Sequence, residues 1–218
     1  MKINQFCRSM VEMLGVLAII GVLSVGAIAG YQKAMFKYKL NKHAQSFNLL
    51  LNNVIQMKPQ LERSFQELNS FDSATFAKLN LIPDGMTYKK PYIYDIFNNK
   101  FTYYIGYHNG GKTFENYFLL ILSSNGNKIT KETSEICQNI LSVTKENSAN
   151  LYYVETRTGL VGQEHSYSSY TLAGDKTCST TNRKCLKNMT LDDINKLCYS
   201  CVSETLCQFM IYLDVKNY

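Results

Sequence analysis

The N-terminal quarter of the chain carries two hydrophobic patterns in succession. In residues 13–30 only Ser24 is polar. Neither Gly nor Pro occurs in residues 31–58, and Pro59 is expected to end the helical pattern there. We therefore predict one continuous helix from about Val11 to Met57. Within 31–57, apolar residues recur at the three-, four- and seven-residue spacings of one helical face: Phe36, Leu40, Phe47, Leu51 and Val54.

The predicted helix is too long for a small soluble domain. At about 1.5 Å per residue it measures roughly 70 Å, several times the length of an average globular helix. Its first part, about 11–30, is long enough to cross a membrane or to form the apolar heart of a targeting segment. Its second part, about 31–57, is amphipathic. The first part needs lipid or copies of itself, which disfavours a soluble cytoplasmic protein.

The remainder of the chain alternates between short helical and strand patterns. Residues 157–188 form a polar stretch rich in Ser, Thr and Gly. The expected fold class is α+β, with a long N-terminal helix followed by a globular region that holds an antiparallel sheet. The predicted elements are a helix from Asp72 to Leu79, a turn at 82–85, strands at 92–97 and 101–107 forming a hairpin around Asn98-Asn99, a strand at 117–122, a helix at 135–145, a strand at 151–155, a capped helix from Thr190 and a strand at 208–215.

The positive charge of the chain is local. The net charge is +6, and residues 31–61 contain five lysines and no acidic residue. A basic excess attracts nucleic acid or anionic lipid. Because it directly follows the apolar block, a lipid surface or a subunit contact is favoured, and no nucleic-acid binding is predicted. The lysines are Lys33, Lys37, Lys39, Lys42 and Lys58.

Seven cysteines indicate an oxidising compartment. Cys7 precedes the apolar block, and the other six fall within the last 82 residues. Six cysteines form three disulfides in one of 15 connectivities; we single out Cys137 with Cys198 only because both fall on predicted helices. Zinc is an alternative use for four of them, although only one close C-x2-C pair is present. The six cysteines are Cys137, Cys178, Cys185, Cys198, Cys201 and Cys207.

The segment from Arg8 to about Met35 resembles the N-terminus of type IV prepilins and pseudopilins. Its most specific part is RSMVEMLGVLAIIGVLSVGAIAG. The resemblance implies cleavage between Cys7 and Arg8, where the family normally has Gly before the cut. It also implies N-methylation of Arg8, and it makes Glu12 the fifth mature residue and an assembly residue. The organisation that follows is a leader at 1–7, a long helix at 8–58 and a disulfide-containing globular domain at 59–218.

The resemblance implies a structural subunit and not an enzyme. Such a subunit is processed by prepilin peptidase, is held in the bacterial inner membrane as a single-pass precursor, and joins other pilin subunits in a helical filament. The filament is a cell-surface type IV pilus or a periplasmic pseudopilus of the type II secretion kind. The globular region resembles the larger, type IVb-like pilins through a cysteine on a late helix and a closing strand. No cofactor and no metal are expected.

Glu12 also invites a role on physical grounds alone. A carboxylate at the edge of hydrocarbon costs several kcal/mol unless it is paired. If cleavage frees the amine of Arg8, a neighbouring subunit can supply that cation and fix the register between helices. The alternative is that Glu12 simply lies among lipid headgroups. Small residues in the apolar block permit close helix packing or are ordinary membrane-helix composition: Gly15, Gly21, Gly26 and Gly30.

Several competing interpretations stay open. Ala27-Ile28-Ala29 fits a signal-peptidase site, and cleavage after Ala29 releases a secreted, disulfide-bonded binding protein. The lysines after the span place the C-terminal region in the cytoplasm by the positive-inside rule, whereas the cysteines and the prepilin-like segment place it outside. Cys198-x2-Cys201 could be redox-active, but it lacks a thioredoxin-like βαβ setting.

A remote alternative is a membrane-anchored P-loop or zinc protein. Gly106-x4-Gly111-Lys112-Thr113 satisfies the Walker A expression. A P-loop requires a following helix, whereas the aromatic residues after Thr113 predict a strand, so a Gly-rich hairpin is preferred. The histidines have no metal-ligand spacing and no hydrolase motif occurs: His43, His108 and His165. The 16 tyrosines are assigned to the core and to subunit contacts.

Overall fold

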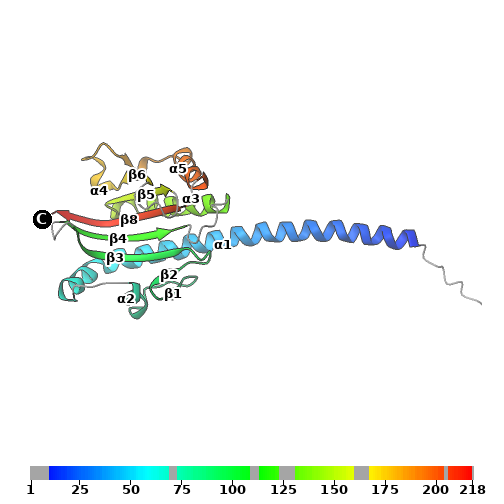
Figure 1. Cartoon of the computed structure of the whole chain (residues 1–218), viewed down its shortest axis with the longest axis horizontal. Coiled ribbons are helices and arrows are strands. Elements are labelled where there is room, and N and C mark those ends of the chain that lie inside the picture. Colours follow the sequence, from blue (N-terminus) through cyan, green and yellow to red (C-terminus); the bar gives the residue numbers. More distant parts are fainter. Residues whose placement is uncertain are drawn as a thin grey trace, which may run out of the picture. The chain divides into compact units, whose positions relative to one another are not determined.

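A single helix, α1 (Met10–Leu68), spans 59 residues and contributes to both units of the protein. The computed structural model describes residues 10–68, 73–108, 113–122, 131–159, 167–203 and 206–217. The chain divides into two compact units, Met1–Lys39 and Leu40–Tyr218. Figure 1 labels the elements in chain order.

Helix α1 continues about ten residues beyond its predicted end at Met57, so the prediction that Pro59 terminates it is wrong. A proline removes one helical hydrogen bond and crowds the preceding turn. The residues that follow it compensate through tertiary contacts. Leu61 is 1% exposed in the core, and Glu62 pairs with two lysines. Burial and charge pairing therefore outweigh the local preference at Pro59.

The globular unit contains an eight-stranded sheet among its described residues. The strand order is β1-β2-β3-β4-β8-β5-β6-β7, so the C-terminal strand lies in the middle. All pairs are antiparallel except β6 with β7. This sheet, together with the helices, confirms the predicted α+β class. The strands are β1 (Thr87–Lys89), β2 (Tyr92–Tyr94), β3 (Lys100–His108), β4 (Thr113–Ile121), β5 (Tyr153–Gly159), β6 (Tyr167–Ala173), β7 (Lys184–Cys185) and β8 (Leu206–Asn217).

Short helices connect and cover the strands. The capped helix start predicted at Thr190 is confirmed: the Thr190 amide donates to Asp193 Oδ2 at 2.7 Å, and the Asp193 amide donates to Thr190 Oγ1 at 3.2 Å. These reciprocal bonds satisfy amides of the first turn that have no partner within the helix. The helices are α2 (Ser73–Lys78), α3 (Lys131–Glu146), α4 (Asp175–Cys178) and α5 (Leu191–Ser203), with 3-10 turns η2 (Ser148–Asn150) and η3 (Leu186–Asn188).

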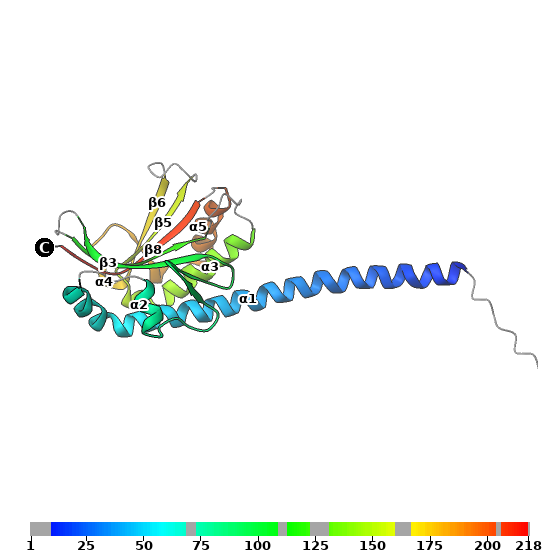
Figure 2. The ribbon, with the colours of Figure 1, turned by 60° about the horizontal axis from the view of Figure 1, so that its bottom comes forward.

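The core lies between the sheet and the part of α1 that belongs to the globular unit. Figure 2 shows this part of the helix running along the sheet. The Phe47 ring lies 5.9 Å from the Phe101 ring of β3, and Phe118 of β4 is fully buried in the same cluster. The predicted apolar face of α1 is confirmed at Phe47, Leu51 and Val54, each at most 1% exposed.

Most of the predicted short elements are present with shifted ends. The predicted hairpin is formed by β2 and β3, in which Ile93 pairs with Phe101, and the turn at 82–85 places Gly85 at φ +89°. No helix or strand is predicted for the polar stretch 157–188, but it contains β6, α4, β7 and η3 in addition to the end of β5. Its Ser- and Thr-rich strand β6 lacks hydrophobic alternation, which explains why the pattern missed it. Asp72, the predicted cap, lies outside the described residues.

Candidate functional site

The first turn of α1 holds the carboxylate that the sequence singles out. Glu12 is exposed and lies two residues after the helix begins, where the positive end of the helix dipole favours an acid. The predicted processing and methylation positions, Cys7 and Arg8, lie outside the described residues. Of the three predicted site residues in the N-terminal unit, Glu12 is therefore the one that lies in the described part of the chain.

The apolar block of residues 13–30, which follows Glu12, is exposed on every side of the helix. The hydroxyl of Ser24 donates to the Ile20 carbonyl at 2.7 Å, so the lone polar side chain is satisfied within the helix. The most hydrophobic window of this helix has a mean hydropathy of 2.4 and is unburied, which makes α1 able to cross a membrane by length and composition. Its large exposed side chains are Met13, Leu14, Val16, Leu17, Ile19, Ile20, Val22, Leu23, Val25 and Ile28.

No neighbouring side chain or backbone among the described residues requires glycine at the four glycine positions of the apolar block. A Cβ built at Gly15, Gly21, Gly26 or Gly30 meets nothing within 4 Å. Each glycine costs a helix roughly 1 kcal/mol relative to alanine. Contact with another helix is one setting in which a missing Cβ gives an advantage, because it allows closer approach.

A ring of four charges fastens α1 to the last strand. Lys58 Nζ lies 2.7 Å from Asp214 Oδ2 and 3.8 Å from Glu62 Oε1, and Lys216 Nζ lies 3.1 Å from Glu62 Oε2 and 3.5 Å from Asp214. Burial by itself raises the pKa of Asp214, but the hydrogen bonds and charges of Lys58 and Lys216 outweigh it and bring the pKa below its ordinary value. Of the four residues in this ring, only Lys58 belongs to a feature predicted from the sequence, the basic stretch of residues 31–61.

A second polar contact joins α1 to the β2–β3 turn. His43 Nε2 lies 3.1 Å from Asp95 Oδ2, with side chains 0% and 1% exposed. Asp95 Oδ1 also accepts hydrogen bonds from the amides of Phe97 and Asn99, both at 2.8 Å. The carboxylate therefore closes the turn and anchors it to the helix. No local pattern indicates this pair, because the partners lie far apart along the chain.

All six C-terminal cysteines are paired. The structure contains the pairing Cys137–Cys198, which joins α3 to α5, and the local pairs Cys178–Cys185 and Cys201–Cys207. The four cysteines of the zinc alternative are thus divided among three disulfides. Among the described residues, no group of three His, Cys, Asp or Glu side chains could hold a metal ion.

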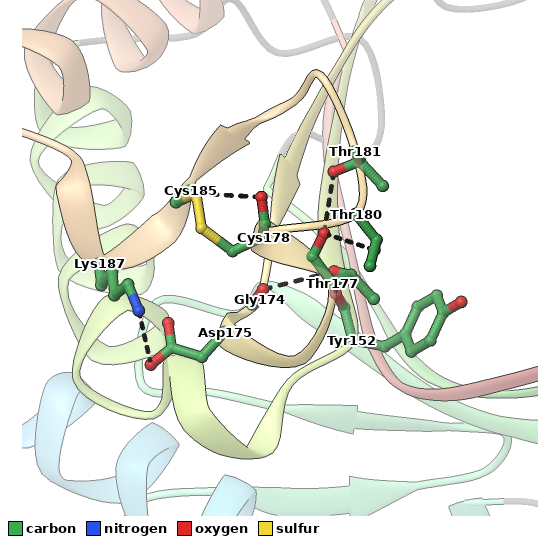
Figure 3. Close-up of a disulfide and its surroundings, with 9 residues drawn as sticks. All are labelled: Tyr152, Gly174, Asp175, Thr177, Cys178, Thr180, Thr181, Cys185 and Lys187. Atoms are coloured by element: carbon green, nitrogen blue, oxygen red, sulfur yellow. Dashed lines mark hydrogen bonds and ion pairs between the residues drawn. A yellow bond between two sulfur atoms is a disulfide. The ribbon is translucent and has the colours of Figure 1, made fainter.

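The start of the Cys178–Cys185 loop is attached by hydrogen bonds to the residue that precedes β5 (Figure 3). Thr177 Oγ1 donates to the Tyr152 carbonyl at 2.6 Å, and the Gly174 amide donates to the same oxygen at 3.0 Å. A Cβ at Gly174 would overlap the carbonyl oxygen of Leu151, so this close approach requires glycine. The disulfide therefore closes a loop whose preceding residues, Gly174 and Thr177, are already fixed by hydrogen bonds to Tyr152.

The Walker-like segment lies in a hairpin. β3 and β4 pair antiparallel with His108 opposite Thr113, and Thr113 begins a strand where a P-loop needs a helix. Within β3, the Tyr104 hydroxyl occupies the space that a Cβ at Gly106 would need. The residues between His108 and Thr113 lie outside the described part of the chain.

A row of tyrosines crosses the sheet on the face opposite the core. Ring centroids are separated by 5.1 Å from Tyr104 to Tyr117, 4.8 Å from Tyr117 to Tyr212 and 4.1 Å from Tyr212 to Tyr153. Burial raises the pKa of Tyr117 and of Tyr153 to about 12, so both phenols are neutral at physiological pH. These tyrosines contact one another within the chain; a role in subunit contacts stays a prediction.

No family model, no curated protein and no solved structure matches this chain. The class of the protein therefore follows from its own features. An N-terminal helix able to cross a membrane precedes an α+β unit stapled by disulfides, and disulfides persist in oxidising compartments. These features indicate a membrane-associated protein with an extracytoplasmic globular unit.

Proposed function

We propose that the chain is a structural subunit of a type IV pilus or of a type II secretion-like pseudopilus. The observation that carries the proposal is the 13–30 segment, which is apolar on all sides of the helix and preceded by the single carboxylate of Glu12. The disulfide-stapled α+β unit that follows supports it. In this proposal prepilin peptidase cleaves before Arg8, and the subunits then leave the inner membrane for a helical filament.

On polymerisation, the contacts of residues 13–30 with lipid are replaced by contacts with the same helix of other subunits. The apolar side chains keep apolar neighbours in both settings, so extraction from the bilayer carries no large hydrophobic cost. The exposed glycines allow neighbouring helices to approach closely. Contacts of this heterologous, non-closing kind generate an open fibre.

Glu12 sets the axial register of the helices. A charged side chain costs about 2.5–3.5 kcal/mol at the centre of a membrane helix on insertion scales, which is an upper limit for Glu12 at the edge of the hydrocarbon, and pairing offsets that cost. The partner in this mechanism is the free amine of Arg8 on a neighbouring subunit. The apolar side chains can pack in many axial registers, whereas one register brings the Glu12 carboxylate and the Arg8 amine together.

Replacement of Glu12 tests the mechanism. We expect Glu12→Ala to insert into the membrane normally but to lower the yield of sedimentable filaments at least tenfold, which corresponds to about 1.4 kcal/mol per lost contact. The matched control is Glu146→Ala, which removes an exposed carboxylate from the end of α3. Normal filament yield from Glu12→Ala, with carbonate-resistant membrane insertion, contradicts the proposed role of the carboxylate.

Mass analysis of the mature N-terminus tests processing separately. A methylated chain beginning at Arg8 supports the filament subunit. A chain beginning at Gly30 indicates instead a secreted protein released after Ala29. An intact Met1 contradicts both processing routes.

A further inference from the structure

The residues that follow the apolar block form a basic and aromatic collar around α1. The collar consists of Tyr31, Lys33, Lys37, Tyr38 and Lys39, and all five side chains are exposed. Tyr31 and Tyr38 are 66% and 62% exposed. Within the described part of the chain, none of the three lysines forms an ion pair. The collar is therefore a charged surface to which the described residues bring no counter-charge.

The position of the collar along the helix matches a lipid headgroup layer. The apolar block of residues 13–30 rises about 27 Å, close to the roughly 30 Å of a bilayer core. The collar begins at the next residue. Helical side chains tilt toward the N-terminus, and lysine stems are flexible, so the ammonium groups reach back toward the bilayer. Tyrosines at such a boundary place their rings at headgroup depth.

The distribution of the lysines around the helix distinguishes lipid from a protein partner. At about 3.6 residues per turn, Lys33 and Lys37 lie on one side, and Lys39 lies nearly opposite them. A protein partner contacts one face of a helix, as the sheet contacts Phe47, Leu51 and Val54. A headgroup layer surrounds the helix and can meet lysines that lie on opposite sides.

We propose that the collar binds the headgroups of anionic phospholipids in the leaflet from which the globular unit emerges. Residues 13–61 contain no Asp or Glu, so the negative charge must come from the partner. Each lysine near an anionic membrane surface contributes roughly fivefold in association, the equivalent of about 1 kcal/mol. The proposal rests on membrane insertion of α1 and is independent of polymerisation.

The test measures lipid selectivity of the full chain. The protein is reconstituted into phosphatidylcholine vesicles that contain trace spin-labelled phosphatidylglycerol or spin-labelled phosphatidylcholine, and electron paramagnetic resonance gives the label fraction immobilised by the helix. Since one lipid headgroup meets one lysine, we expect each phosphatidylglycerol to associate about fivefold more strongly than phosphatidylcholine at low salt. The ratio should fall toward 1 in 0.5 M salt, a concentration that shortens the screening length to about 4 Å. The variant K33Q/K37Q/K39Q is expected to show a ratio near 1.

Two control variants separate charge at the collar from charge elsewhere. K78Q/K90Q/K176Q removes three exposed lysines from the globular unit and should keep the wild-type ratio. K33R/K37R/K39R should also keep it, because the interaction is electrostatic. A wild-type ratio near 1, or an unchanged ratio in K33Q/K37Q/K39Q, overturns the proposal. If that variant keeps lipid selectivity but loses self-association, the collar binds sister chains instead, which also overturns it.

Discussion

Removing the Cys137–Cys198 disulfide should destabilise the globular unit more than removing either local disulfide. This bond spans 61 residues, whereas Cys178–Cys185 spans 7. In the chain-entropy model, closure of the longer loop contributes about 4 kcal/mol and closure of the shorter one about 2 kcal/mol. For a unit of this size, each kcal/mol shifts the melting temperature by about 2–4 °C.

Relative to Cys178–Cys185, packing acts in the same direction as loop length; Cys201 and Cys207 are as buried as Cys137 and Cys198, so that pair differs from Cys137–Cys198 in loop length alone. Cys137 and Cys198 are 1% and 0% exposed between α3 and α5, so replacement with alanine also deletes buried sulfur. Cys178 and Cys185 are half-buried, and Thr177 holds the base of their loop by its hydrogen bond to Tyr152. The difference between the two double variants should therefore be at least about 2 kcal/mol.

The assay is urea unfolding of the full chain in detergent micelles, followed by near-ultraviolet circular dichroism of the tyrosines. C137A/C198A is compared with C178A/C185A, and C201A/C207A serves as the second short-loop control, with a separation of 6 residues. Double replacement leaves no free thiol from the pair. Equal losses for all three variants, or a larger loss for a short loop, would refute the loop-closure reasoning.

Two further predictions concern single residues. Gly174→Ala should cost about 3 kcal/mol, because its Cβ would overlap the Leu151 carbonyl; Gly21→Ala, with open space around the Cβ, is the control, and equal melting temperatures of the two variants would contradict the account. Lys58→Met should cost about 2 kcal/mol at pH 7, measured by urea unfolding. The pKa of Asp214 is lower in the folded state, so its pairing stabilises the fold above about pH 4 and this contribution is lost as the pH falls further. The difference between Lys58→Met and wild type should therefore narrow below about pH 4, and a constant difference from pH 7 to pH 2 would exclude the pairing as its cause.

Hydrophobic periodicity was sufficient to locate the principal elements. The spacing of Phe47, Leu51 and Val54 predicted the buried face of α1. The helix predicted at 135–145 is α3, in which Ile136, Ile140 and Val143 are at most 5% exposed. Periodicity failed where tertiary contacts override local preference. Helix α1 continues past Pro59 because later residues are buried and paired, and β6 forms from a Ser- and Thr-rich segment because it adds to the edge of β5.

The residues of the candidate site show the same difference between features that a local pattern predicts and features that depend on tertiary contacts. Glu12 was identifiable because it is the last acidic residue before a long apolar block, a feature confined to one segment. The ring of Lys58, Glu62, Asp214 and Lys216 was not identifiable, because it joins a helix and a strand from opposite ends of the chain. Contacts of this kind depend on strand order, and the central position of β8 is not evident from any local pattern.

The attachment of α1 to the sheet depends on burial and not on covalent bonds. All three disulfides lie between Cys137 and Cys207, and α1 contains no cysteine. Five fully buried α1 side chains contribute about 10 kcal/mol together, compared with about 2 kcal/mol from the charge ring. Loss of the disulfides therefore loosens the α3–α5 side of the unit first, while α1 stays packed on the sheet. The five side chains are Phe47, Leu50, Leu51, Val54 and Leu61.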